Sequence, residues 1–116
     1  MNIKRGDIWL ATLDPTQGSE QAGTRPVVIF QNETILQYSI TVVAIPLTTN
    51  LRRLSLPTCV LIPQNEKSVK VDSVALCHQI RVLDKTRLVH KLGELDVDTI
   101  ENLDKCVLFT LGILNV

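Results

Sequence analysis

Short apolar runs separated by polar or turn-forming residues fill most of the chain. Within these runs apolar residues stand together or alternate with polar ones, and β-branched residues are frequent, which is typical of strands. The runs that we expect to form strands are residues 7–13, 27–30, 40–45, 57–63, 72–83 and 88–92. Several short strands at close spacing, with few helical signals between them, predict a small and strongly bent barrel or sandwich.

The pattern changes to a helical period near the end of the chain. Asp98 can cap a helix, and Glu101 three residues later completes a capping-box-like start. The apolar residues that follow at helical spacing are Ile100, Leu103, Val107, Leu108, Leu111 and Leu114. We therefore expect one C-terminal helix that packs this apolar stripe against the barrel.

A long polar loop, residues 14–26, separates the first two expected strands. A hairpin needs only about two to five loop residues, and loops beyond about a dozen are usually functional or disordered. This loop has two glycines for backbone freedom, a proline near each end, and Arg25. We expect an ordered loop that gathers hydroxyl, carboxylate, amide and guanidinium groups for a ligand rich in oxygen, such as a phosphodiester. The alternative is a solvated loop with a structural pair between Arg25 and Glu20.

Length and composition predict one ordinary globular domain over residues 1–116. Apolar residues make up 45% of the chain, but no apolar run reaches the roughly 18 residues of a membrane span. The first residues lack the apolar core of a signal peptide. Cys59, Cys77 and Cys106 are odd in number and widely spaced, which favours a reduced cytoplasmic chain without a zinc site. We expect these cysteines to be small buried apolar residues.

The formal net charge of zero conceals an uneven distribution along the chain. Residues 94–116 hold five acids and one base, which leaves 11 bases and seven acids before them. The acidic segment can form a separate face on a moderately basic body. This asymmetry hints at an anionic partner.

Familiar catalytic signatures are absent, among them a phosphate-binding loop ending in Lys-Ser/Thr, a Gly-x-Ser-x-Gly elbow and a HExxH zinc motif. His78 and His90 are not spaced with carboxylates as a metal site requires. We therefore expect chemistry without a metal or another cofactor. The candidate groups are Arg25, Thr48-Thr49-Asn50, Arg52-Arg53 and His78-Gln79-Ile80-Arg81. The alternative for each is a structural or solvated side chain.

Several segments together resemble the MazF/PemK family of toxin ribonucleases. The likeness covers nearly the whole chain in order, and its most specific part is a Gly-Ser-Glu-Gln loop followed by Arg-Pro. The segments that carry it are Arg5-Gly6-Asp7-Ile8-Trp9, Asp14-Pro15, Gly18 to Gly23, Arg25-Pro26-Val27-Val28, Gln31-Asn32, Pro46-Leu47-Thr48, Leu56-Pro57-Thr58, Gln79-Ile80-Arg81 and Asp84-Lys85.

The resemblance implies a mainly β fold, namely a small SH3-like barrel of the CcdB/PemK type with a C-terminal α-helix. It implies a cytoplasmic homodimer that cleaves single-stranded RNA without a cofactor. It also implies a cognate MazE-like antitoxin whose disordered tail occupies the RNA groove. The products would be 2′,3′-cyclic phosphate and 5′-hydroxyl ends, formed when the RNA's own 2′-hydroxyl attacks the phosphorus.

The resemblance also assigns roles to single residues. Arg25 and Thr48 match the catalytic pair of the family, and a guanidinium fork suits a phosphorane. His78 stands where the family usually has an acidic residue, which puts the cleaved RNA sequence in doubt. The residues expected to contact substrate are Ser19, Glu20, Gln21, Thr49, Arg53, His78, Gln79 and Arg81.

Two other functions remain open from the sequence. A gyrase-poisoning toxin can use the same barrel and would act through its C-terminal helix. A non-catalytic RNA-binding module would bind RNA without cutting it. The cleaved motif, the class of target RNA, the general base and the identity of the antitoxin do not follow from the sequence.

Overall fold

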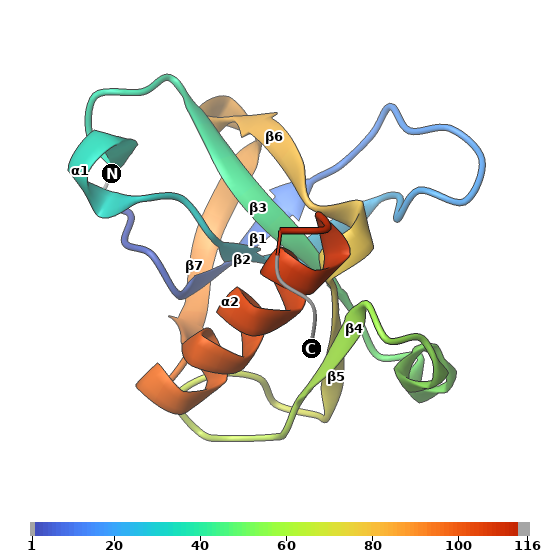
Figure 1. The fold of residues 1–116 in the computed structure, drawn as a ribbon. Coiled ribbons are helices and arrows are strands. Elements are labelled where there is room, and N and C mark those ends of the chain that lie inside the picture. Colours follow the sequence, from blue (N-terminus) through green and yellow to red (C-terminus); the bar gives the residue numbers. More distant parts are fainter. Residues whose placement is uncertain (1, 114–116) are drawn as a thin grey trace.

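A strongly bent antiparallel sheet and one long helix make up the protein (Figure 1). The computed structural model describes residues 2–113, and within them the sheet has seven strands. Their hydrogen-bonded order is β4-β5-β3-β2-β1-β7, and β6 also pairs with β3. The strands are β1 (Asp7–Thr12), β2 (Thr24–Ile29), β3 (Thr41–Thr48), β4 (Cys59–Ile62), β5 (Ser73–Leu76), β6 (Arg81–Asp84) and β7 (Leu88–Glu94). The mainly β fold with a C-terminal helix is confirmed.

Most central strands bury both of their faces, which explains why they are apolar without a clean alternation. Along β2, Val27 and Ile29 enter one core cluster, whereas Val28 enters a second. The second cluster includes Leu103 and Val107 of the C-terminal helix α2 (Val97–Thr110), so it lies between the sheet and the helix. A strand with apolar neighbours on both faces is expected to be continuously hydrophobic.

Helix α2 begins earlier than the sequence pattern indicated. Asp96 is the N-cap residue, and its carboxylate accepts a hydrogen bond from the Thr99 backbone N–H at 2.8 Å. This backbone hydrogen bond lowers the pKa of Asp96. Asp98, which we expected to cap the helix, lies in the first turn instead. The sequence pattern places the N-cap two residues too far along the chain, because either aspartate can serve as an N-cap.

The apolar stripe of α2 is only partly buried. Leu103 and Val107 are buried, whereas 37% of Leu108 and 56% of Leu111 is exposed. Leu114 lies outside the described residues. No helix within residues 2–113 is long and apolar enough to cross a membrane.

Arg5 and Gly6 join α2 to the barrel. The Arg5 guanidinium forms an ion pair with Asp104 of α2 and lies 4.4 Å from the centre of the Phe30 ring. Gly6 has φ +89, and a Cβ atom there would come within 2.5 Å of Ile100 Cδ1. The positive φ of Gly6 is a conformation that other residues rarely adopt, so it favours glycine at this contact with the helix.

The strand expected over residues 72–83 is two strands separated by a turn. A 3-10 helix, η2 (Cys77–Gln79), lies between β5 and β6, and Ile80 N–H donates to Cys77 O at 3.2 Å. Both strands pair with β3, β6 with its first half and β5 with its last residues. His78 and Gln79, which we expected within one strand, therefore lie in a turn.

Short helical turns that the sequence pattern missed connect the other strands. They are α1 (Glu33–Leu36), η1 (Leu51–Ser55) and η3 (Lys85–Arg87). Asn32, Asn50 and Asp84 each accept a backbone hydrogen bond at the start of one of these turns. Turns of three to five residues are too short to leave a helical period in the sequence.

The three cysteines are free thiols, and their burial differs. Cys77 is fully buried, as expected, whereas Cys59 and Cys106 are half-buried. Burial is the main cause that raises the pKa of the Cys77 and Cys59 thiols. Thiols with a raised pKa are poor nucleophiles, which agrees with a packing role.

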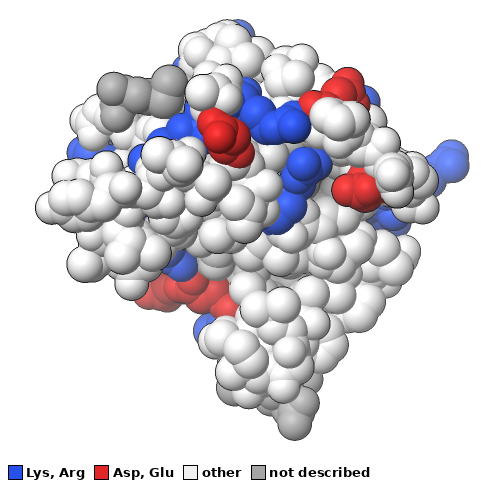
Figure 2. Space-filling view, turned by 90° about the horizontal axis from the view of Figure 1, so that it is seen from above, with Lys and Arg blue, Asp and Glu red and all other residues white. Residues whose placement is uncertain are grey.

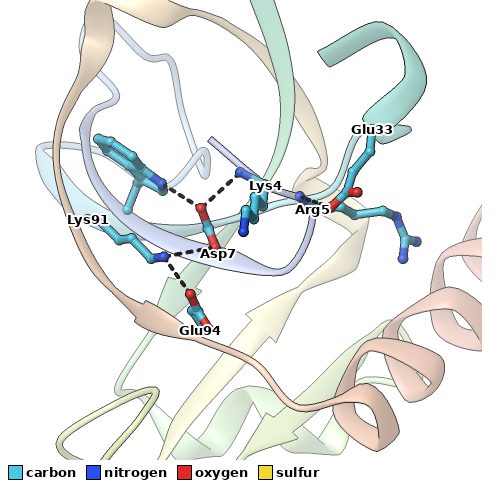
Figure 3. Close-up of polar contacts among 7 residues, drawn as sticks. Lys4, Arg5, Asp7, Glu33, Lys91 and Glu94 are labelled. Carbon is cyan, nitrogen blue, oxygen red and sulfur yellow. Dashed lines mark hydrogen bonds and ion pairs between the residues drawn. The ribbon is translucent and has the colours of Figure 1, made fainter. Parts of the chain in front are cut away.

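Asp7 is a buried carboxylate at the start of β1, and it holds the N-terminal segment (Figure 3). It accepts hydrogen bonds from Lys4 N–H at 2.9 Å and Trp9 Nε1 at 3.4 Å. Lys91 Nζ of β7 lies 3.4 Å from Asp7 and 2.6 Å from Glu94. The hydrogen bond to Glu94 is the main cause that raises the pKa of Lys91. A buried carboxylate needs such partners.

We expect the Asp7→Asn variant to lower the free energy of unfolding by about 2 kcal/mol, because charge-assisted hydrogen bonds and the attraction to Lys91 are lost. Urea unfolding of wild type and variant measures this difference. Glu66→Gln, at an exposed position, is the matched control. Equal stability of the two variants would contradict a structural role for the Asp7 charge.

Candidate active site

The segment between β1 and β2, residues 13–23, is an ordered loop that projects from the barrel (Figure 1). Its base is closed by hydrogen bonds from Leu13 N–H to Gly23 O at 2.9 Å and from Gly23 N–H to Asp14 Oδ1 at 3.1 Å. Gly18 and Gly23 have φ values of +57 and +79. This left-handed backbone favours glycine, so both glycines serve the conformation of the loop as expected.

Two arginines, from β6 and η3, hold the start of this β1–β2 loop. Arg81 Nη1 donates to Leu13 O at 3.3 Å, and Arg87 Nη1 donates to Thr12 O at 3.1 Å and also to Asp14 O. Arg81 was expected as a substrate contact, and part of its guanidinium holds the loop. Arg87 was not singled out from the sequence, because nothing near it in the chain indicated a contact more than seventy residues away.

Gln79 connects η2 to the tip of the loop. Gln21 N–H donates to Gln79 Oε1 at 2.6 Å, and Gln79 Nε2 donates to Ser19 O at 3.3 Å. Glu20, between these two residues, is exposed, and its carboxylate accepts from Gln17 N–H at 2.9 Å. The tip is therefore a small folded unit attached to η2.

A pocket of about 220 Å³ lies where the loop tip meets η2 and the start of β6. Polar and charged side chains from two distant parts of the sequence converge on it. Its lining residues are Glu20, Gln21, His78, Gln79, Ile80 and Arg81. Five of these six were among the expected substrate contacts, so the structure brings together groups that lie more than fifty positions apart in the chain.

Arg25 lies near the start of β2 and Thr48 at the end of β3, and neither residue lines this pocket. Strand β2 pairs with β3 through Val27 and Pro46, and the same antiparallel register, continued by two residues, sets Arg25 opposite Thr48. Arg25 is exposed, and its Nε donates to Ala22 O at 3.0 Å, next to Gln21 in the pocket wall. Arg25 is therefore connected to the pocket wall through Ala22, and the continued register relates Thr48 to Arg25.

The donor groups of Arg25 and Thr48 that are not used within the described chain are suited to binding an anion. Thr48 Oγ1 accepts from Asn50 N–H at 3.2 Å, and its hydroxyl hydrogen can still be donated. Within residues 2–113, Nε is the one nitrogen of the Arg25 guanidinium that has a hydrogen-bond partner. The alternative ion pair between Arg25 and Glu20 is not formed in the described part of the chain.

His78 is an exposed residue of η2 that contacts the segment before β4. Its Nδ1 is hydrogen-bonded to Thr58 Oγ1 at 2.9 Å, and Cys59 Sγ lies 3.9 Å away. The imidazole thus lines the pocket and also joins η2 to a neighbouring loop.

Thr49 and Arg53 lie farther along the chain from Thr48 and do not line the pocket. Thr49 is exposed directly after β3, and Arg53 is half-buried in η1. In Figure 1, η1 and the β1–β2 loop project from the same side of the barrel. These two residues can therefore contact only a ligand that extends beyond the pocket.

Acidic and basic side chains are mixed on the surface rather than separated. Figure 2 shows Lys and Arg side chains gathered near the centre of one face, with Asp and Glu side chains close beside them. Acids near the end of the chain pair with bases from the body, as in Asp104 with Arg5 and Glu94 with Lys91. The expected separate acidic face is therefore only partial.

Comparison with known proteins identifies the family. The family described as "PemK-like, MazF-like toxin of type II toxin-antitoxin system" matches residues 4–111. Endoribonuclease MazF of Staphylococcus epidermidis is 44% identical over 113 residues, covering 97% of this chain and 94% of that protein.

Solved structures show the same fold at lower identity. A mycobacterial endoribonuclease in complex with its cognate antitoxin has a TM-score of 0.81 and 23% identity, covering 99% of this chain and 100% of that chain. MazF of Deinococcus radiodurans also has a TM-score of 0.81 at 23% identity, covering 95% of this chain and 96% of that one.

The fold is thus that of the small β-barrel toxins of toxin–antitoxin systems. The chain belongs to the PemK-like, MazF-like toxins of type II systems, and it is a homologue of an endoribonuclease. The family expected from the sequence is confirmed. No cluster of three or more His, Cys, Asp or Glu side chains suited to a metal ion occurs in the described part of the chain.

We expect the Arg87→Ala variant to loosen the β1–β2 loop, because both carbonyl groups at its start lose their guanidinium donor. Hydrogen–deuterium exchange should become faster in residues 13–23, while the strands of the core keep their protection. Arg52→Ala is the matched control, because Arg52 is exposed and, within residues 2–113, donates only through its backbone to Asn50. Unchanged exchange in the loop of Arg87→Ala would contradict this role.

Proposed function

We propose that this chain is the toxin of a type II toxin–antitoxin system and cleaves single-stranded RNA at specific sequences without a metal ion. The observation that carries the proposal is the 44% identity of the chain to Endoribonuclease MazF, supported by the strand register that relates Arg25 to Thr48 and by the polar pocket at the loop tip. Cleavage of messenger RNA in the cytoplasm would inhibit translation and growth.

The proposed reaction uses the substrate's own nucleophile. The 2′-oxygen of a ribose attacks the adjacent phosphorus, and the bond from phosphorus to the 5′-oxygen of the next nucleotide breaks. The products are a 2′,3′-cyclic phosphate and a 5′-hydroxyl. The protein must hold the two oxygens in line, stabilise the charge of the phosphorane, accept one proton and return one to the leaving oxygen.

Arg25 and Thr48 stabilise the phosphorane in this proposal. The planar guanidinium has five N–H donors, of which Nε is already used by Ala22 O. The terminal nitrogens face no such partner in residues 2–113 and can bind two phosphorane oxygens. Thr48 donates its hydroxyl to a non-bridging oxygen. Because the guanidinium stays protonated near neutral pH, Arg25 is assigned charge stabilisation rather than base catalysis.

Glu20 is the candidate acceptor of the 2′-hydroxyl proton, because it is the carboxylate among the residues that line the pocket. Its exposed position leaves it accessible to substrate. The general acid that protonates the 5′-oxygen is solvent or Arg25 itself.

Hydrogen bonds rather than base stacking would select the RNA sequence. The lining residues of the pocket include no Phe, Tyr or Trp, whereas amide, imidazole and guanidinium groups are present. Ser19, Gln21, His78 and Arg81 would contact the nucleotides at the pocket, and Thr49 and Arg53 those beyond it. Single-stranded RNA exposes its base edges to such groups.

A homodimer and a cognate antitoxin complete the proposal. Apolar side chains remain exposed on β4 and α2, among them Leu61, Leu108 and Leu111. A second copy of the chain that covers them would remove this apolar surface from water. The mycobacterial structural neighbour is a complex with its cognate antitoxin. By analogy, a small MazE-like antitoxin would place a disordered tail in the RNA groove of this toxin.

We expect the Arg25→Ala variant to cut RNA about a hundredfold to a thousandfold more slowly, because the main donor to the phosphorane is removed. The assay uses purified protein, a long unstructured RNA and EDTA, with the fragment ends mapped. Discrete cuts that carry a 2′,3′-cyclic phosphate in wild type support the mechanism.

Toxicity that survives in Arg25→Ala, without RNA cleavage by wild type, would support the gyrase-poisoning alternative. RNA binding by wild type without any cleavage would support the non-catalytic alternative. Arg52→Ala serves again as the control for the loss of one positive charge.

Thr48 provides a second test of the catalytic pair. We expect Thr48→Val, which has a similar shape but no hydroxyl, to cleave at least about tenfold more slowly because one donor to the phosphate is lost. Thr48→Ser keeps the hydroxyl and should retain most of the rate. Equal rates for the two variants would show that the hydroxyl takes no part in the reaction.

A further inference from the structure

The amide of Gln79 is hydrogen-bonded through both its oxygen and its nitrogen to the backbone of the β1–β2 loop. Its oxygen accepts from Gln21 N–H at 2.6 Å, and its nitrogen donates to Ser19 O at 3.3 Å. Ser19 and Gln21 are the two neighbours of Glu20 in the chain. The amide therefore holds the backbone on both sides of the carboxylate that lines the pocket.

Few other hydrogen bonds join the tip of the loop to the barrel. Arg81 and Arg87 hold the loop at residues 12–14, and Arg25 Nε donates to Ala22 O. The hydrogen bonds between Gln17 and Glu20 stay within the tip. Within the described chain, the two hydrogen bonds of the Gln79 side chain are thus the ones that join residues 15–21 to the rest of the protein.

The turn η2, which carries Gln79, is anchored to the core and to the segment before β4. Gln79 is the last residue of η2, which begins with the fully buried Cys77. Cys77 N–H donates to Thr58 O at 3.0 Å, and His78 Nδ1 is hydrogen-bonded to Thr58 Oγ1 at 2.9 Å. A side chain fixed to such a turn can order a loop that has no core of its own.

We propose that Gln79 is a positioning residue, which attaches the tip of the β1–β2 loop to η2 by two hydrogen bonds and thereby holds Glu20 at the pocket. This inference rests on the proposed function for its catalytic consequence. It assigns to Gln79 the ordering of the loop, because its amide oxygen and its amide nitrogen each hydrogen-bond a backbone group of the loop tip. The glutamine acts through the residues that it orders, chiefly Glu20.

The first test measures the loop without RNA. Gln79→Ala removes both hydrogen bonds, and we expect the amide of Gln21 to exchange at least about tenfold faster, while the core strands remain protected. Gln79→Glu keeps an oxygen for Gln21 N–H but loses the donor to Ser19 O, so its exchange should be intermediate. Gln64→Ala, at an exposed position, is the control. Unchanged exchange in Gln79→Ala would overturn the proposal.

The second test measures cleavage of one RNA oligonucleotide that contains the mapped site. We expect Gln79→Ala to lower kcat about tenfold with a smaller change in KM, because the reacting groups are misplaced rather than removed. A raised KM with an unchanged kcat, together with normal exchange in the loop, would indicate direct RNA contact and overturn the proposal.

A double-mutant cycle tests whether Gln79 acts through Glu20. The Glu20→Gln variant retains an oxygen for Gln17 N–H but has no carboxylate. If Gln79 positions that carboxylate, Gln79→Ala should slow cleavage much less in the Glu20→Gln background than in wild type. An equal effect in both backgrounds would overturn the route through Glu20.

The experiments separate this proposal from the proposed function. A wild-type chain that cuts no RNA would refute the endoribonuclease function. In that case the exchange of the Gln21 amide would still show whether Gln79 holds the loop.

Discussion

The rest of the structure depends on the way strand β3 pairs with its neighbouring strands. One of its edges pairs with β2, while the other edge pairs first with β6 and then with β5. Strands β5 and β6 share this edge of β3, and the chain between them leaves the sheet as the turn η2. The end of β3 also sets Thr48 opposite Arg25. A single strand therefore ends at Thr48 and pairs with both strands that flank the turn holding the loop.

The polar loop depends on the barrel for its shape. Arginines on β6 and η3 hold its start, Gln79 holds its tip, and Arg25 holds its end through Ala22. Each of these ties uses a side chain from a structured element and a backbone group of the loop. An exposed loop without apolar contacts of its own is ordered in this way, and its functional groups stay close to the sheet.

The pocket carries opposite charges and amides rather than a broad basic surface. A net charge of zero is compatible with RNA as the proposed substrate because a few well-placed donors can bind one phosphate strongly. His78 lines the pocket, and its hydrogen bond to Thr58 joins the pocket wall to the loop that leads to β4.

The sequence by itself determined the mainly β class, the C-terminal helix, the long ordered loop and, through its resemblance, the family. These features follow from local patterns, such as short apolar runs, a helical period and paired glycines. The tertiary structure decided the break at η2, the start of α2 at Asp96 and the attachment of Arg81, Arg87 and Gln79 to the loop. Long-range pairing decides such contacts, because a side chain meets a backbone group sixty or more positions away only once the sheet has brought the strands together. Arg87, for example, reaches the loop because β7 pairs with β1.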